Sequence, residues 1–154
     1  DIFANGNGAV DAVTAKVAQG LKLLAGDAWA GKEATTLAEA LRPCDEECRI
    51  VTRADGSTIE HVNAAWERLC GFTAEEVVGK STSIIQGAKT DRRVLRLLKE
   101  FLPREDVRLE ATLINYKRGG TPFANQLRIT PLQSGNGERF FLAVLSELNP
   151  NSLA

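Results

Sequence analysis

Three amide side chains lie in segments that are otherwise apolar. Asn125 stands in the middle of an alternating apolar run over residues 123–131, and Asn115 follows Leu113 in a second such run. Gln86 follows two isoleucines. A buried amide left unpaired costs about 1–3 kcal/mol, so each needs a hydrogen-bond partner. That partner can be backbone, water or a ligand, and the amides are therefore candidate ligand-binding residues, with loop capping as the alternative.

Residues for catalysis or metal binding are scarce. His61 is the only histidine, and neither a GxSxG nucleophile motif nor an HExxH motif occurs in the sequence. Cys44 and Cys48 lack two further ligands at the spacing of a structural zinc site. Cys70 brings the cysteines to an odd number, which is typical of a reduced, intracellular protein. We therefore expect neither an enzyme nor a metal site.

The composition is typical of a globular domain. Hydrophobic residues make up 44% and charged residues 25% of 154 residues, with a formal net charge of −1. That balance favours neither nucleic acid nor an anionic membrane as a partner. Neither a membrane span nor a signal peptide is indicated. Because the chain starts at Asp1 and lacks methionine, we expect a piece of a longer protein whose effector, of unknown identity, lies elsewhere.

The hydrophobic pattern divides the chain into an N-terminal helical extension, a body and a C-terminal tail, which span residues 1–47, 48–148 and 149–154. In the extension, apolar residues at helical spacing over 10–24 predict an amphipathic helix. Thr36 and Glu39 form a capping box for a second short helix, which Pro43 ends.

The body combines strands and helices in an order typical of an α+β domain. A longer helix is predicted over 91–102, preceded by short helices that Asn63 and Thr73 cap. The predicted strands cover residues 48–54, 57–62, 107–117, 121–132 and 138–147. This order predicts a five-stranded antiparallel sheet with short helices on one face.

The last predicted strand is apolar on both faces. Phe140, Leu142 and Val144 form its outer side, where a solvated sheet would carry polar residues. We expect the N-terminal helix or a second copy of the chain to cover this interaction surface.

Three segments of the body, residues 71–80, 85–91 and 113–125, resemble the PAS superfamily and specifically its LOV (light-oxygen-voltage) branch. The resemblance covers residues 48–147, about two thirds of the chain, in colinear order. It implies a PAS fold, a sensory or interaction module, and a central pocket. In photoactive members the pocket holds FMN, and blue light joins a loop cysteine to the flavin.

The resemblance fails at several of the positions that carry this photochemistry. Thr82 stands where photoactive members have the cysteine, and Ser83 replaces one of the two arginines that hold the FMN phosphate. Lys99 replaces the second arginine, and Leu145 replaces a glutamine that senses the flavin ring. A hydroxyl is far less nucleophilic than a thiolate, so the usual adduct is not expected.

Other positions match the resemblance. Gln86, Asn115 and Asn125 stand where the family bonds the ribityl chain and the ring edge. A lost charge-assisted hydrogen bond costs about 1.5–3 kcal/mol, or ~10 to 150-fold in affinity, so FMN binding is expected to be weak or lost. FMN and riboflavin are the candidate cofactors, and riboflavin loses nothing at the phosphate positions. We expect a regulatory sensor or protein-interaction module without adduct photochemistry. The alternatives are a photoreceptor that reduces a flavin non-covalently and a pocket for another metabolite.

Overall fold

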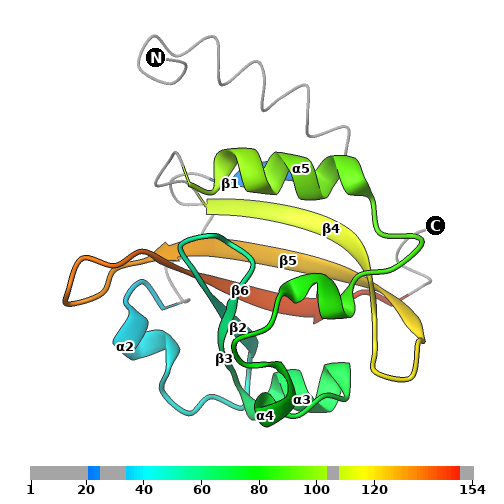
Figure 1. The fold of residues 1–154 in the computed structure, drawn as a ribbon, viewed down its shortest axis with the longest axis horizontal. Helices are drawn as coiled ribbons and strands as arrows, with labels where there is room; N and C mark the ends of the chain where they lie inside the picture. The colour runs from blue at the N-terminus through cyan, green and yellow to red at the C-terminus, as the bar shows by residue number, and fades with distance from the viewer. Residues whose placement is uncertain (1–20, 25–33, 104–107, 150–154) are drawn as a thin grey trace, which may run out of the picture.

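The computed structural model describes residues 21–24, 34–103 and 108–149, and Figure 1 shows their arrangement. The strands are β1 (Leu21–Leu24), β2 (Cys48–Arg53), β3 (Ile59–Val62), β4 (Arg108–Tyr116), β5 (Pro122–Leu132) and β6 (Phe140–Glu147). The helices are α2 (Leu37–Ala40), α3 (Ala64–Cys70), α4 (Ala74–Val77), the 3₁₀-helix η2 (Thr82–Ile85) and α5 (Arg92–Phe101).

The six strands form one antiparallel sheet in the order β1-β4-β5-β6-β2-β3. The five predicted strands are all present, and their bounds differ from the predicted ones by no more than two residues. The register pairs Asn125 of β5 with Leu113 of β4, so that neighbouring strands bring their apolar positions to the same face. The predicted antiparallel sheet of five strands is confirmed, and one further strand extends it.

The sixth strand, β1, corrects the predicted helix over residues 10–24. Its four residues pair with Arg108–Ala111 at the free edge of β4. The helical spacing of the leucines is overridden here by backbone pairing to that edge, and Gly20 and Gly26 on either side weaken a helix. Residues 10–20 of the predicted helix lie outside the described residues.

The helices begin at the predicted capping residues. The side chains of Thr36, Asn63 and Thr73 each accept a hydrogen bond from a backbone N–H in the first turn of the helix that follows. Asp91 caps α5 in the same way. Between α4 and α5, η2 forms one short turn. Within the described ranges, no helix is long and apolar enough to cross a membrane.

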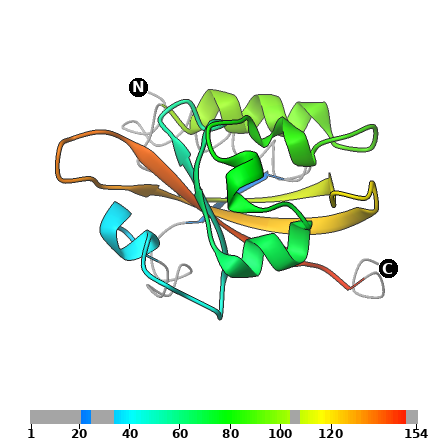
Figure 2. The same cartoon turned by 60° about the horizontal axis from the view of Figure 1, so that its bottom comes forward.

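Helices α3, α4 and α5 cover the inner face of the sheet (Figures 1 and 2). One apolar cluster joins α5 to the centre of the sheet through residues such as Val94, Leu98 and Ile129. A second cluster joins α3 and α4 to β2, β3 and the end of β6, and Trp66 is fully buried within it. Between these two clusters the inner face is not completely filled, and the candidate site lies there.

The outer face at β6 is covered by a different part of the chain. Phe140, Leu142 and Val144, the predicted interaction surface, are all buried, at 7%, 0% and 3% exposure. They pack in a third cluster with Ala34 and Ala40, and Leu37 lies against it. Residues 34–40, which end in α2, therefore cover this face, and docking of a second copy there stays a prediction.

Candidate functional site

A cavity of about 260 Å³ lies between the inner face of the sheet, η2 and α5. Four of the sequence-predicted site residues line it: Thr82 of η2, Gln86 just after η2, Asn115 of β4 and Lys99 of α5. Leu145 of β6 also lines the cavity. The fifth predicted residue, Asn125, is fully buried on β5 and reaches the site through Asn115 rather than as part of the cavity wall.

The two asparagines form a pair with a fixed orientation. Asn115 Nδ2 donates to the carbonyl oxygen of Ile85 at 3.1 Å, so its Oδ1 points toward β5. Asn125 Nδ2 donates to that Oδ1 at 2.9 Å. The remaining atom, Asn125 Oδ1, is buried without a hydrogen-bond partner among the described residues. The pair therefore presents an unused buried acceptor, for which an N–H donor on a ligand is the complementary group.

Hydrogen bonds hold the loop that follows η2 to β4 and so position Gln86 beside Asn115. The Gly87 N–H donates to Thr90 Oγ1 at 2.9 Å, and Thr90 Oγ1 donates to the carbonyl oxygen of Ile114 at 2.6 Å. A Cβ atom at Gly87 would lie 2.4 Å from the ring of Tyr116, so only glycine lets the loop lie this close to β4. The loop after η2 is thus held to the strand that carries Asn115.

The entrance of the cavity contains a residue that the sequence analysis did not select. Asp55, in the turn between β2 and β3, lines the cavity together with Gly56 and Ser57. In the sequence, Asp55-Gly56 is typical of a hairpin turn, and no local signal connects that turn to α5. Among the described residues that line the cavity, Asp55 is the one carboxylate and Lys99 the one cation.

The three cysteines, all in the described part of the chain, lie away from the cavity wall. Cys70 is fully buried in α3, and burial raises the pKa of its thiol to about 12. Burial likewise raises the pKa of Cys48 to about 12. Because the thiolate is the reactive form, both are expected to be unreactive at neutral pH. The cavity instead presents the hydroxyl-bearing Thr82.

The polar side chains in and behind the cavity wall fit the ring edge of a flavin better than they fit a flavin phosphate. A flavin ring edge carries an amide N–H and carbonyl groups, which match the unused Asn125 acceptor and the amide of Gln86. A phosphate would meet the single cation Lys99, with Asp55 at the same entrance. The volume lies slightly below the about 300–1,000 Å³ of typical ligand pockets.

A larger hollow of about 490 Å³ lies beside the β5–β6 turn, and its wall includes Thr35, Thr130 and Ser134. None of the sequence-predicted pocket residues lines it. The smaller inner cavity is the better candidate because the selected polar residues converge there.

Comparison with known proteins identifies the fold family. A family model described as "PAS domain" matches residues 46–147. The chain therefore belongs to the PAS domain family. Its similar proteins include a blue-light-activated histidine kinase of Brucella anthropi, 35% identical over 86 residues, which are 56% of this chain and 17% of the kinase. A blue-light photoreceptor of Listeria innocua is 29% identical over 56% of this chain and 34% of its own length.

Among solved structures, the LOV domain of a blue-light-activated histidine kinase from Erythrobacter litoralis is similar. The match has a TM-score of 0.60 and 27% identity, and it covers 68% of this chain and 97% of that domain. The chain is thus a PAS domain of the sensory type, related to LOV domains of blue-light photoreceptors. It spans less than a fifth of the Brucella anthropi kinase.

Proposed function

We propose that this domain is a regulatory LOV-like sensor or protein-interaction module that works without a bond between a cysteine and a flavin. The observation that carries the proposal is the placement of Thr82, which lines the cavity on η2 while the cysteines lie elsewhere. A threonine hydroxyl is a weak nucleophile unless a base activates it. Histidine is the most frequent such base, and His61, the one histidine, does not line the cavity.

The chain's own residues would hold a flavin through hydrogen bonds and apolar contact only. A flavin, when bound, would supply blue-light absorption and reversible redox chemistry. The amides of Gln86 and Asn115, which line the cavity, would orient the ring edge together with Asn125 Oδ1 behind Asn115. Leu98 and Leu145 would exclude water from the ring. Lys99 alone would attract a phosphate, so FMN is held weakly or not at all. The domain is proposed to have no enzymatic activity of its own.

The output of this module is proposed to be a change in packing on the outer face. There Leu142 and Val144 lie under residues 34–40. A ligand that favours one packing arrangement shifts the equilibrium only by its difference in affinity for the two states. If substitution of Leu142 and Val144 left both the oligomeric state and the hydrogen-exchange protection of α2 unchanged, this part of the proposal would be wrong.

The test compares the protein with a variant, Thr82→Cys, after incubation with FMN or riboflavin and removal of free flavin. Under blue light, the wild-type protein is expected to keep its flavin absorption, because no thiol lines the cavity. The Thr82→Cys variant is expected to lose that absorption and to recover it in the dark. Cys44→Ser is the control and should behave like wild type. Reversible loss of the absorption in wild-type protein under these conditions would refute the proposal.

A second candidate function is photoreception through non-covalent flavin reduction, and the unused Asn125 Oδ1 acceptor favours it. Trp66 and Tyr116 are aromatic residues able to supply an electron, but neither lines the cavity. An added electron donor such as EDTA would therefore be needed. Illumination of the flavin-loaded protein with EDTA, without oxygen, should then bleach the flavin, and air should restore it. Absence of bound flavin after both incubations would exclude this second candidate.

A further inference from the structure

The entrance of the cavity is rich in hydroxyl groups and nearly balanced in charge. Ser57, Ser81 and Thr82 bring hydroxyls to the wall, and Asp55 and Lys99 bring one charge of each sign. The rest of the wall is apolar except for the buried Thr52 and the amides of Gln86 and Asn115. The polar part of a ligand would therefore meet donors and acceptors at the entrance rather than a positive field.

The two charged residues belong to elements that lie against each other. A Cβ atom at Gly56, next to Asp55, would lie 3.4 Å from Cδ1 of Leu102, which follows Lys99 by about one helical turn. The turn between β2 and β3 therefore contacts the C-terminal end of α5. Figure 1 shows that turn reaching across the sheet toward α5.

The side chain of Asp55 is held in place. Its Oδ1 accepts hydrogen bonds from the backbone N–H groups of Ser57 and Thr58, each at 2.8 Å, and its Oδ2 accepts one from Thr58 Oγ1. Burial acts to raise the pKa of this carboxyl, but the hydrogen bonds from Thr58 and Ser57 and the charge of Arg53 outweigh it and lower the pKa. Asp55 is therefore ionised at neutral pH.

We propose that this entrance recognises an uncharged polyhydroxyl chain and disfavours a phosphate, so that the pocket takes flavins of the riboflavin class in preference to FMN. The inference rests on the proposed function of the same pocket. Asp55 and the hydroxyls accept and donate hydrogen bonds to ligand hydroxyls. A phosphate would bring about two negative charges between Asp55 and Lys99, whose opposite charges cancel, so the entrance offers no net attraction to offset the cost of desolvating the phosphate.

The experiment measures the dissociation constants of riboflavin and FMN for the full chain by flavin fluorescence titration, in buffer of low ionic strength. Riboflavin is expected to bind ~10-fold more tightly than FMN, the size of one lost charge-assisted contact. Asp55→Asn keeps a side-chain oxygen for the turn but removes the charge. It should tighten FMN binding ~3- to 10-fold and change riboflavin binding less than ~2-fold.

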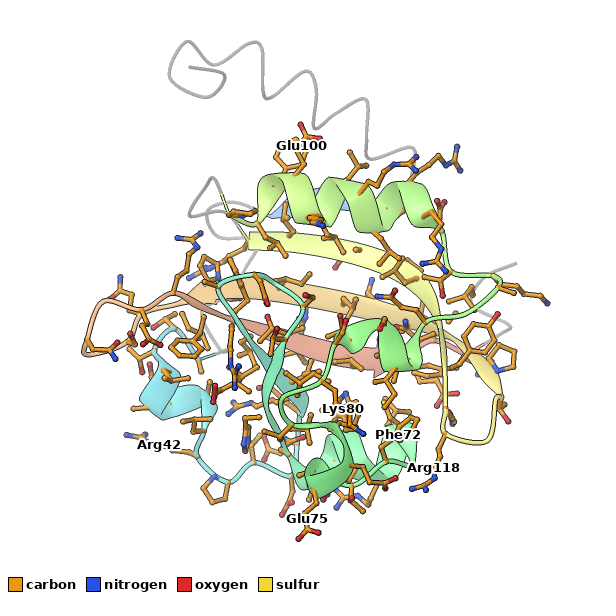
Figure 3. The ribbon with its side chains drawn as sticks, viewed as in Figure 1. Arg42, Phe72, Glu75, Lys80, Glu100 and Arg118 are labelled. Carbon is orange, nitrogen blue, oxygen red and sulfur yellow. The ribbon has the colours of Figure 1, made fainter. Side chains whose placement is uncertain are left out.

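Glu75→Gln is the matched control, because it removes one negative charge from α4, where Figure 3 shows Glu75 pointing away from the sheet. It should leave both dissociation constants within ~2-fold of wild type. The salt dependence of wild-type protein gives a test that needs no variant. Raising the ionic strength should leave the ratio of the two dissociation constants within ~2-fold, because the charges of Asp55 and Lys99 are screened alike. A larger change would show that one of the two charges dominates at the entrance.

FMN binding as tight as riboflavin, or binding of neither flavin, would overturn this inference. The proposed function fails on a different result, the formation of a flavin adduct by wild-type protein. The two failures are therefore distinguishable in the same samples.

Discussion

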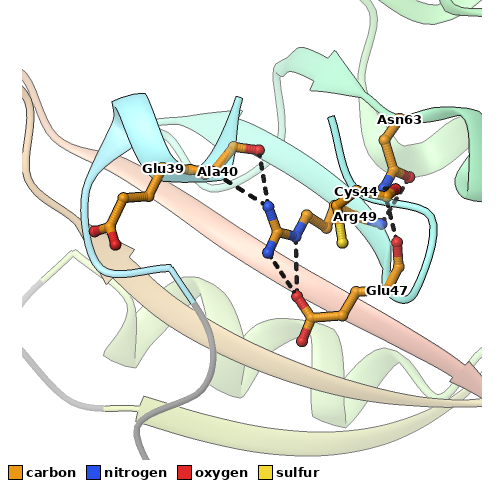
Figure 4. A network of polar contacts seen from close by, with 6 residues as sticks. All are labelled: Glu39, Ala40, Cys44, Glu47, Arg49 and Asn63. Carbon is orange, nitrogen blue, oxygen red and sulfur yellow. Dashed lines mark hydrogen bonds and ion pairs between the residues drawn. The ribbon is translucent and has the colours of Figure 1, made fainter. Parts of the chain in front are cut away.

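Two buried polar groups in this domain differ in how completely their hydrogen bonds are formed. The Arg49–Asn63 network, drawn in Figure 4, ties β2 to α2 and α3, and the Asn115–Asn125 pair lies behind the inner cavity. The main amide of each is buried, Asn63 at 8% exposure and Asn125 at 0%. Of these two amides, Asn125 is the one with a buried atom that has no hydrogen-bond partner among the described residues.

In the network, Asn63 uses its whole side chain. Its Oδ1 accepts hydrogen bonds from the N–H groups of Arg49 and Trp66, both at 3.0 Å. Its Nδ2 donates to the carbonyl oxygens of Cys44 and Glu47, at 3.0 and 2.7 Å. A buried amide satisfied in this way stabilises one local arrangement of the chain.

Arg49 extends the network to the outer face. Its guanidinium pairs with Glu47 at 2.8 Å and donates to the carbonyl oxygens of Glu39 and Ala40 at the end of α2. The contrast with Asn125 indicates two purposes. The network maintains the fold, whereas the Asn115–Asn125 pair leaves one acceptor without a partner, which we propose a ligand uses.

Asn63→Ala is expected to give the largest loss of stability. The variant loses the N-cap of α3, and the Arg49 N–H and two carbonyl oxygens lose their hydrogen-bond partner. We expect the free energy of unfolding to fall by about 3 kcal/mol or more. Denaturant unfolding followed by circular dichroism measures it. Asn136→Ala, in the exposed turn between β5 and β6, is the control and should lose no more than about 1 kcal/mol. Equal losses in the two variants would contradict the stabilising role of the network.

Arg49→Ala should have the next largest effect, a loss of about 1–3 kcal/mol, because it leaves Glu47 partly buried without its ion-pair partner. It should also raise hydrogen exchange in α2, whose last carbonyls lose a donor. Arg53→Ala on the same strand is the matched control. Arg53 pairs with Glu60, but its side chain is 52% exposed, so its removal should cost under about 1 kcal/mol. Unchanged exchange in α2 of Arg49→Ala would show that Arg49 does not hold that helix.

Local sequence signals predicted most of the fold and only part of the site. Caps such as Thr36 and Asn63 and the alternating strands depend on residues within a few positions of one another, and they were confirmed. Strand β1 was missed because it depends on the distant edge of β4. Asp55 was missed because its local signal, a turn, says nothing of its closeness to α5.

The unpaired acceptor, Asn125 Oδ1, also could not be predicted from the sequence. The sequence identified Asn125 as a polar residue on an apolar face, but which atom stays unpaired depends on Asn115. The orientation of Asn115 in turn depends on the carbonyl of Ile85, thirty positions away. Such chains of long-range contacts are fixed by packing rather than by local pattern.

A smaller, pH-dependent effect should come from Cys70, the fully buried last residue of α3. Burial raises the pKa of its thiol from 9.0 to about 12. Between these values the unfolded thiol ionises and the folded one does not, so stability is complete below about pH 9 and falls as the pH rises toward 12. At about pH 10 the loss should be about 1 kcal/mol. Comparing unfolding of wild type and Cys70→Ala at pH 8 and about pH 10 isolates the thiol, and equal pH slopes would refute a buried, neutral Cys70.

Asn125→Leu should change the stability of the ligand-free protein least, although Asn125 is more completely buried than Asn63 or Asn115. The substitution removes the unpaired Oδ1, which is favourable, and takes the donor Nδ2 from Asn115, which is unfavourable. The two effects oppose each other, so the free energy of unfolding should change by less than about 1 kcal/mol. The expected loss for Asn63→Ala is about 3 kcal/mol.

Flavin titration of the same Asn125→Leu protein completes the comparison. The loss of the acceptor should weaken riboflavin binding by ~10-fold or more, while the fold remains intact. A large loss of stability with unchanged binding would mean that Asn125 is a structural residue like Asn63. The combination of stable fold and lost binding is the result that only a ligand-directed acceptor produces.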